Sequence, residues 1–353
     1  MRICIFLILL CLLGACSKPQ VEVVSIPEEI CTLTLDSVYN EEVLLNATGI
    51  VATSDYLVVS NLSKDTIFDV FDRKSLRYLY SDLINGQGPN DMLPFRWIRY
   101  LNDNDFYVVG LGVPVLTEIN SSDCLRVKHR RSIDWENDIC QNIFPLSDSK
   151  VLIQPGKKNG EWVIYDETAD KHIDMPEFPF KNDEDETNMF KVFQNRAVNV
   201  AIKNGGERIA FFYVMVPFVR FFNDKGDVLC EANVGEEISK ASSFLNDGHM
   251  YYTRCIVAGD YIYVKYVPKK KEDNFTYFQI WDWNGSLLAV FRIEDRLNLF
   301  TISPDGNTLY AVKRDNDHVF RCSLAPVLEK ISNAIPSYVE NSSLGLNCHD
   351  GGK

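Results

Sequence analysis

The sequence predicts an all-β protein built as a six-bladed β-propeller with four-stranded blades. Three observations lead to this prediction. A pattern of short apolar strands repeats about every 50 residues, a polar turn precedes the strongest strand of each repeat, and proline recurs in the loop that follows it. The chain has 353 residues, and six blades of this size account for roughly 300 of them.

Residues 1–15 are expected to be a lipoprotein signal peptide. One basic residue, Arg2, precedes an apolar run from Ile3 to Leu13. The run is too short to cross a membrane, because a spanning helix needs about 20 residues. It ends at Leu13-Gly14-Ala15-Cys16, which fits a bacterial lipobox. Cleavage before Cys16 would leave a cysteine that carries lipid such as palmitate, and two acyl chains hold a protein stably on a membrane. An ordinary signal peptide cleaved at a small-residue site is the alternative.

Residues 16–29 are expected to form a tether, and residues 30–35 a strand that closes the ring. The segment from Ile30 to Leu35 alternates in polarity, as a half-buried strand does. The last blade lacks an obvious fourth strand after Val319-Phe320-Arg321-Cys322. We therefore expect residues 30–35 to pair in that blade, where they would cover an edge that is otherwise open.

The propeller itself is expected over residues 30–325. Its six strongest strands begin at positions 56, 106, 151, 209, 261 and 309, each after a turn rich in Asn, Asp, Ser or Gly. A second apolar strand ending in Asp or Asn follows five of them, as at Ile280-Trp281-Asp282. Between the two strands proline recurs, at Pro114, Pro155, Pro217 and Pro268. Proline has no N–H to donate and is found at strand ends. A β-sandwich with irregular spacing is the alternative fold.

Residues 326–353 are expected to hold a short C-terminal helix and a disordered tail. The helix is predicted from Val327 to Ile335 by its amphipathic spacing. The segment 341–353 is polar and ends in glycines, which is typical of a disordered terminus.

Two short segments resemble known propeller families. Ser303-Pro304-Asp305-Gly306 resembles the repeat motif of TolB-like propellers, although only one full copy is present. Gly86-Gln87-Gly88-Pro89-Asn90-Asp91 resembles the Gly-x-Gly-Pro-Gly-Glu loop of NHL-like bacterial propeller lipoproteins, and departs from it at Asn90 and Asp91. The resemblance implies a six-bladed fold in the bacterial cell envelope. It implies no activity, because propellers host many functions.

Composition excludes some functions. The formal net charge is −13, which argues against nucleic-acid binding and against attachment to anionic lipid by charge. No catalytic motif is visible, and no cofactor is expected. The five histidines show no H-x-x-x-H spacing, so no metal site is predicted either.

The candidate binding residues lie in the loops that contain the recurring proline. These loops belong to one face of a propeller and carry a mild excess of basic residues over acidic ones, against the acidic balance of the whole chain. Such a face attracts a polar or anionic ligand, although exposed lysines also serve solubility alone. The predicted ligand-binding residues are Lys157, Lys158, Lys269, Lys270, Lys271 and Arg314.

Two function classes remain open at this point. The first is a binding or scaffold module, lipid-anchored at Cys16 in the cell envelope, with an envelope protein or a glycan as partner. Ser17 after the cysteine resembles the outer-membrane class of lipoproteins. The second is an envelope hydrolase or lyase that uses the central channel. The absence of a histidine cluster suited to a channel metal counts against the second class.

Overall fold

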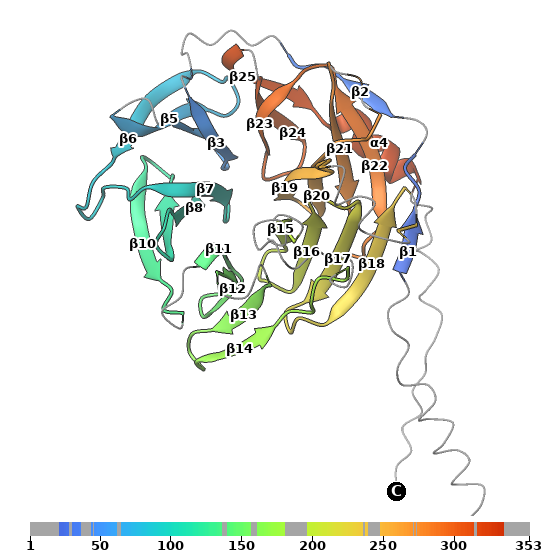
Figure 1. Cartoon of the computed structure of the whole chain (residues 1–353). Helices are drawn as coiled ribbons and strands as arrows, with labels where there is room; N and C mark the ends of the chain where they lie inside the picture. The colour runs from blue at the N-terminus through green and yellow to red at the C-terminus, as the bar shows by residue number, and fades with distance from the viewer. Residues whose placement is uncertain are drawn as a thin grey trace, which may run out of the picture.

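Six β-sheets surround a central axis in the computed structural model (Figure 1). It describes residues 21–27, 30–36, 44, 46–61, 65–135, 140–156, 161–180, 196–235, 237–238, 248–270, 272, 274–313 and 316–334. The six-bladed all-β propeller predicted from the repeat is therefore confirmed. Each sheet contains one blade whose strands follow one another in the chain, and two of the sheets have one further strand from the N-terminal segment.

The first three blades are formed by residues 47–174. Blade one holds β3 (Ala47–Ala52), β4 (Tyr56–Asn61), β5 (Thr66–Asp72) and β6 (Tyr78–Ile84). Blade two holds β7 (Phe95–Tyr100), β8 (Asp105–Gly110), β9 (Val115–Asn120) and β10 (Arg126–Ser132). Blade three holds β11 (Cys140–Pro145), β12 (Lys150–Pro155), β13 (Val163–Asp166) and β14 (Lys171–Asp174).

The other three blades are formed by residues 198–323. Blade four holds β15 (Val198–Ile202), β16 (Arg208–Tyr213), β17 (Phe218–Asn223) and β18 (Val228–Val234). Blade five holds β19 (Tyr252–Ala258), β20 (Tyr261–Tyr266), β21 (Thr276–Trp281) and β22 (Leu287–Ile293). Blade six holds β23 (Leu297–Ile302), β24 (Thr308–Lys313) and β25 (Asn316–Ser323).

The sequence repeat maps directly onto the blades. Each strongest run is the second strand of its blade, and the polar turn before it joins that strand to the innermost one. Because neighbouring strands within a blade are antiparallel, these turns all lie at one end of the blades, together with the turns between third and fourth strands. We call this end the turn face. The proline loops and the connections between blades form the opposite end, the loop face.

The core consists of apolar clusters between neighbouring blades. Phe68 of blade one packs edge-on against Phe106 of blade two, with ring centroids 5.6 Å apart. Phe212 of blade four meets Trp281 of blade five in the same way at 5.9 Å. The ring closes between blades one and six, where Leu57 and Val319 belong to one buried cluster. Burial of these side chains supplies the main favourable free energy of the fold.

The N-terminal segment corrects the prediction for residues 16–35. Within the expected tether, β1 (Val21–Val24) adds to blade four as a fifth strand, parallel to β18. Residues 31–33 form β2 (Cys31–Leu33), which pairs with β22 of blade five and not with the last blade. Asp36 forms an isolated bridge and an ion pair with Arg321 in β25 of blade six. Among the described residues, blade six therefore has three strands.

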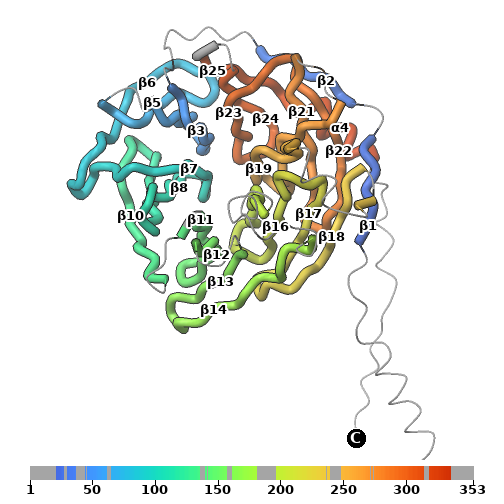
Figure 2. The backbone as a smooth tube through the Cα atoms, viewed as in Figure 1, coloured from blue at the N-terminus to red at the C-terminus, as the bar shows by residue number. Residues whose placement is uncertain are grey.

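The physical reason is the path of the chain around the outside of the propeller. Figure 2 shows the segment in blue along the outer strands of blades four and five, next to β18 and β22. It contacts three outer edges in turn, so it leaves only a few residues for each. We call residues 21–27 and 30–36 the outer belt. Like a closing strand, it covers edges that would otherwise be exposed.

The C-terminal helix is confirmed, one to two residues from its predicted bounds. The helix α4 (Ala325–Ala334) buries Val327 and Ile331 in the cluster that also holds Leu33 of the outer belt. The predicted signal peptide, Cys16 and the tail at 341–353 lie outside the described residues. Among the residues described, no helix is long and apolar enough to cross a membrane.

Candidate functional site

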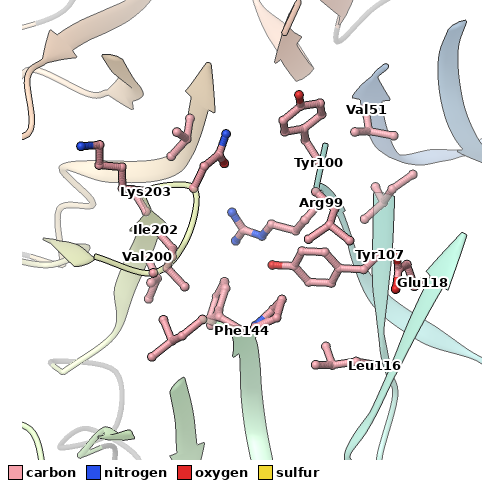
Figure 3. A pocket seen from close by; sticks show the side chains of 18 of the residues that line it. Val51, Arg99, Tyr100, Tyr107, Leu116, Glu118, Phe144, Val200, Ile202 and Lys203 are labelled. Carbon is pink, nitrogen blue, oxygen red and sulfur yellow. The ribbon is translucent and has the colours of Figure 1, made fainter. Parts of the chain in front are cut away.

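A pocket of about 530 Å³ occupies the centre of the propeller. The innermost strands of all six blades contribute to its wall, with Val51, Arg99, Phe144, Val200, Cys255 and Thr301. It also extends between blades two and three, where Tyr107 and Leu116 line it (Figure 3). At the turn face, its rim is formed by turn residues such as Ser147 and Asn204. The fold thus directs six strands from distant parts of the chain towards one cavity.

Two of the innermost strands carry arginine where the others are mostly apolar. The strands β3, β15 and β23 read ATGIVA, VNVAI and LNLFTI. By contrast, β7 reads FRWIRY and β19 reads YTRCIVA. Arg99 on β7 lines the pocket, whereas Arg254 on β19 does not line it but contacts the wall residue Ile50. Sequence reasoning missed both residues, because they lie within strands and belong to no recognised motif. The available signal was an arginine inside the first strand of a repeat.

Arg99 projects from β7 into the pocket. Figure 3 shows its side chain between Tyr100 and Phe144, with the guanidinium group directed into the open space. The Nη1 atom donates a hydrogen bond of 3.4 Å to the carbonyl oxygen of Cys255 on β19. The guanidinium carbon lies 5.1 Å from the ring centroid of Phe144, within the range of a cation–π contact. Arg99 therefore bridges from blade two to blade five across the channel.

Arg254 is the residue before Cys255 on β19. Its Nη2 atom donates to the carbonyl oxygen of Ile50 at 3.4 Å, and its guanidinium carbon lies 5.8 Å from the ring centroid of Phe300. Burial, followed by the positive charge of Arg99, lowers the pKa of Arg254 to about 10. The group is thus still protonated at neutral pH, and it lies close enough to Arg99 for the two cations to repel each other.

Three other charged groups along the pocket have partners of opposite charge. Arg131 pairs with Glu167 at 2.5 Å, and Lys203 pairs with Glu207 at 3.3 Å. Glu118 pairs with Lys128 at 2.7 Å. Within the described part of the chain, neither Arg99 nor Arg254 forms an ion pair with a carboxylate.

The thiol of Cys255 also lies at the pocket wall. Its sulfur donates to the carbonyl oxygen of Val200 at 3.0 Å, and the residue is 1% exposed. Burial raises the pKa of the Cys255 thiol above its ordinary value. Since the thiolate is the nucleophilic form, the protonated thiol acts here as a packing group and a weak donor.

The predicted loop-face residues are placed only in part. Lys157, Lys158, Lys271 and Arg314 lie outside the described residues. Lys269 and Lys270 are exposed in the connection between β20 and β21, and Lys269 Nζ lies 5.9 Å from the ring centroid of Tyr251. This connection belongs to the loop face, at the end of the blades opposite the rim of the pocket. Neither lysine lines the pocket.

No group of three or more metal-ligating side chains is found in the described ranges. The sequence suggested two sites, the loop face and the central channel. The pocket described above lies in the central channel.

Comparison with known proteins supports the fold. The model of a protein family described as "TolB-like 6-blade propeller-like" matches residues 32–305. A member of the DUF4221 family from Bacteroides vulgatus superposes with a TM-score of 0.52 and 12% identity, covering 87% of this chain and 99% of its own. A Bacteroides fragilis protein described as exported superposes with a TM-score of 0.53 and 10% identity, covering 86% and 98%. No curated protein matches the chain.

Proposed function

Because the chain belongs to the family of TolB-like six-bladed propellers, we propose that it is a binding module of the bacterial cell envelope whose ligand occupies the central pocket. The observation that carries this proposal is the pocket of about 530 Å³ to which all six innermost strands contribute. A cavity of this size, with apolar walls and a few convergent polar groups, is typical of a small-molecule site.

The envelope location rests on separate support. The lipobox at Leu13-Gly14-Ala15-Cys16 favours a lipid anchor. The similar Bacteroides fragilis propeller is described as exported, which agrees with this location. An anchored module would hold its ligand next to the membrane. Ser17, directly after the cysteine, favours the outer membrane as the location.

The proposal places the ligand in the channel and leaves the loop face as a separate surface. The basic residues predicted there, among them Lys269 and Lys270, would then contact a macromolecular partner such as an envelope protein or a glycan. The two sites are at different ends of the blades, so they can be tested independently.

Filling the pocket tests the proposal. Ile202 lies at the end of β15, lines the pocket and is only partly buried. The substitution Ile202→Trp should occupy the cavity and abolish binding of small molecules to the purified protein. The readout is saturation-transfer NMR with a panel of sugars, amino acids and organic acids.

The control is Ile173→Trp, which adds the same ring to an exposed site on the outer strand β14 (44% exposed). Its binding profile should match the wild type. If no panel member binds the wild type, or if both variants bind equally well, the channel is not the ligand site. The hydrolase or lyase alternative uses the same channel, and turnover of a panel member would favour it.

A further inference from the structure

We propose that Arg99 forms an anion site in the central pocket, with Arg254 behind the pocket wall adding positive charge, and that its ligand is a small organic carboxylate with an apolar body. This inference rests on the proposed function, because it names the ligand class of the same pocket. It goes beyond that function in assigning the residue that selects the ligand.

The first argument is the uncompensated charge. Arg99 points into the pocket and donates to the carbonyl of Cys255 on β19, while Arg254 reaches from β19 to the carbonyl of the wall residue Ile50. Within the described residues neither has a carboxylate partner, whereas Arg131 and Lys203 in the same wall do. Unpaired charges away from bulk water are costly. A bound anion would offset this cost.

The second argument is the number of unused donors. A guanidinium group has five N–H donors in a fixed plane. The structure gives Arg99 a bond of 3.4 Å to a carbonyl oxygen and a hydrogen bond with the Cys255 side chain, and gives Arg254 one bond of 3.4 Å to a carbonyl oxygen. Both carbonyl bonds are longer than is usual for an N–H donor. A carboxylate accepts two parallel N–H bonds from one guanidinium group, so it fits the remaining N–H donors of Arg99.

The third argument is the apolar surface around the charge. Leu116, Phe144, Val200 and Ile202 line the pocket near Arg99 (Figure 3). A dianion such as phosphate would find few additional donors on these side chains. A carboxylate with a hydrocarbon or aromatic body would place its charge on Arg99 and its body against these walls, where burial is favourable.

Direct binding to matched probes tests this inference. The full-length protein is titrated by calorimetry with benzoate and hexanoate, with their neutral amides, and with inorganic phosphate. The carboxylates should bind, and the amides and phosphate should not bind measurably. Arg99→Met should weaken carboxylate binding by roughly tenfold to a hundredfold, as expected for loss of a hydrogen bond between charged groups. Arg254→Met should weaken it less, because Arg254 does not line the pocket. Lys203→Gln, a paired cation at the rim, should retain the affinity.

The melting temperature without ligand separates a binding role from a structural one. Removal of one of two repelling charges should leave the melting temperature of Arg99→Met equal to or above that of the wild type, whereas loss of a structural contact would lower it. If benzamide binds as tightly as benzoate, the pocket still binds ligands but the anion site is refuted. Binding of phosphate in preference to the carboxylates refutes the ligand class. Equal losses in the Arg99→Met and Lys203→Gln variants refute the assignment of the residues.

Discussion

Asp105 shows how one side chain stabilises a whole turn. It is the last residue of the polar cluster Asn102–Asp105 and is only 5% exposed. Its carboxylate accepts hydrogen bonds from Asn120 Nδ2 at 2.7 Å, Lys128 Nζ at 2.9 Å and Asn102 Nδ2 at 3.0 Å. Burial raises the pKa of Asp105, but the bonds from Lys128 and the two amides outweigh it, so the pKa lies below the ordinary 3.8.

The substitution Asp105→Asn should destabilise the protein by about 1–3 kcal/mol at neutral pH, because it removes a charged acceptor from a buried network. A lowered pKa means that the carboxylate stabilises the fold at pH values above 3.8, and that this contribution is lost as pH falls through the folded-state pKa. Urea unfolding at several pH values should therefore show a constant difference from wild type near neutrality and a shrinking difference below about pH 4.

The exposed Asp123 provides a control for this prediction. Asp123→Asn should change the free energy of unfolding by less than about 0.5 kcal/mol. A difference between wild type and Asp105→Asn that stays constant down to pH 2 would contradict the role given to the carboxylate.

At the scale of elements, the turns of blades three and four approach each other closely at the pocket rim. Gly206 has a φ of 75°, in the left-handed region. A Cβ atom at this position would lie 2.5 Å from the carbonyl oxygen of Leu146. The adjacent Gly205 has a φ of 85° and would meet nothing within 4 Å. Both glycines are thus needed for the turn, but only Gly206 is needed for the contact between blades.

Comparison of Gly206→Ala with Gly205→Ala isolates this contact. Each variant should lose about 1–2 kcal/mol from left-handed strain. Gly206→Ala should lose roughly 1–3 kcal/mol more, because backbone atoms would have to shift. Thermal or urea unfolding provides the measurement, and equal losses in the two variants would show that the turns adjust freely.

The outer belt is a second feature at this scale. Leu33 in β2 is 7% exposed and packs in the cluster of blade five, while Val23 in β1 is 51% exposed. The substitution Leu33→Ala should cost about 2–4 kcal/mol in the free energy of unfolding. Val23→Ala should cost less than about 0.5 kcal/mol. Similar small values for both, measured by urea unfolding, would mean that the belt adds little to the stability of the propeller.

For the whole molecule, the belt also relates the proposed anchor to the pocket. Because β1 runs parallel to β18, Val21 lies nearer the turn face than Val24 does. The five residues from Cys16 to Gln20 reach at most about 18 Å when extended. A lipid on Cys16 would therefore keep the turn face of blade four close to the membrane, on the side where the rim of the pocket lies.

Cys16→Ala tests the anchor. The variant should appear in the soluble fraction after cell lysis, whereas the wild type should sediment with membranes and resist a high-salt wash, because a lipid anchor does not depend on charge. A second variant, Ser17→Ala, keeps the cysteine and should stay with the membranes. Sedimentation of Cys16→Ala after the salt wash would contradict lipid anchoring.

The periodic sequence was sufficient for the fold class and the order of its elements. Turns such as Asn102–Asp105 and the apolar strands after them recur in every blade. Each blade has to reverse the chain between its strands and to bury both faces of its sheet, and both requirements are local. The C-terminal helix could be predicted for the same reason, since amphipathic spacing is a local property.

Only the tertiary structure decided where these elements meet. The alternation of residues 30–35 indicates a strand. It carries no information about the strand with which this segment pairs, so it could not distinguish β22 from the last blade. The proximity of Arg99 and Arg254 could not be predicted either, because the two residues are separated by more than 150 positions in the chain. Their proximity arises from the closure of the ring, which brings the innermost strands of blades two and five to the same channel.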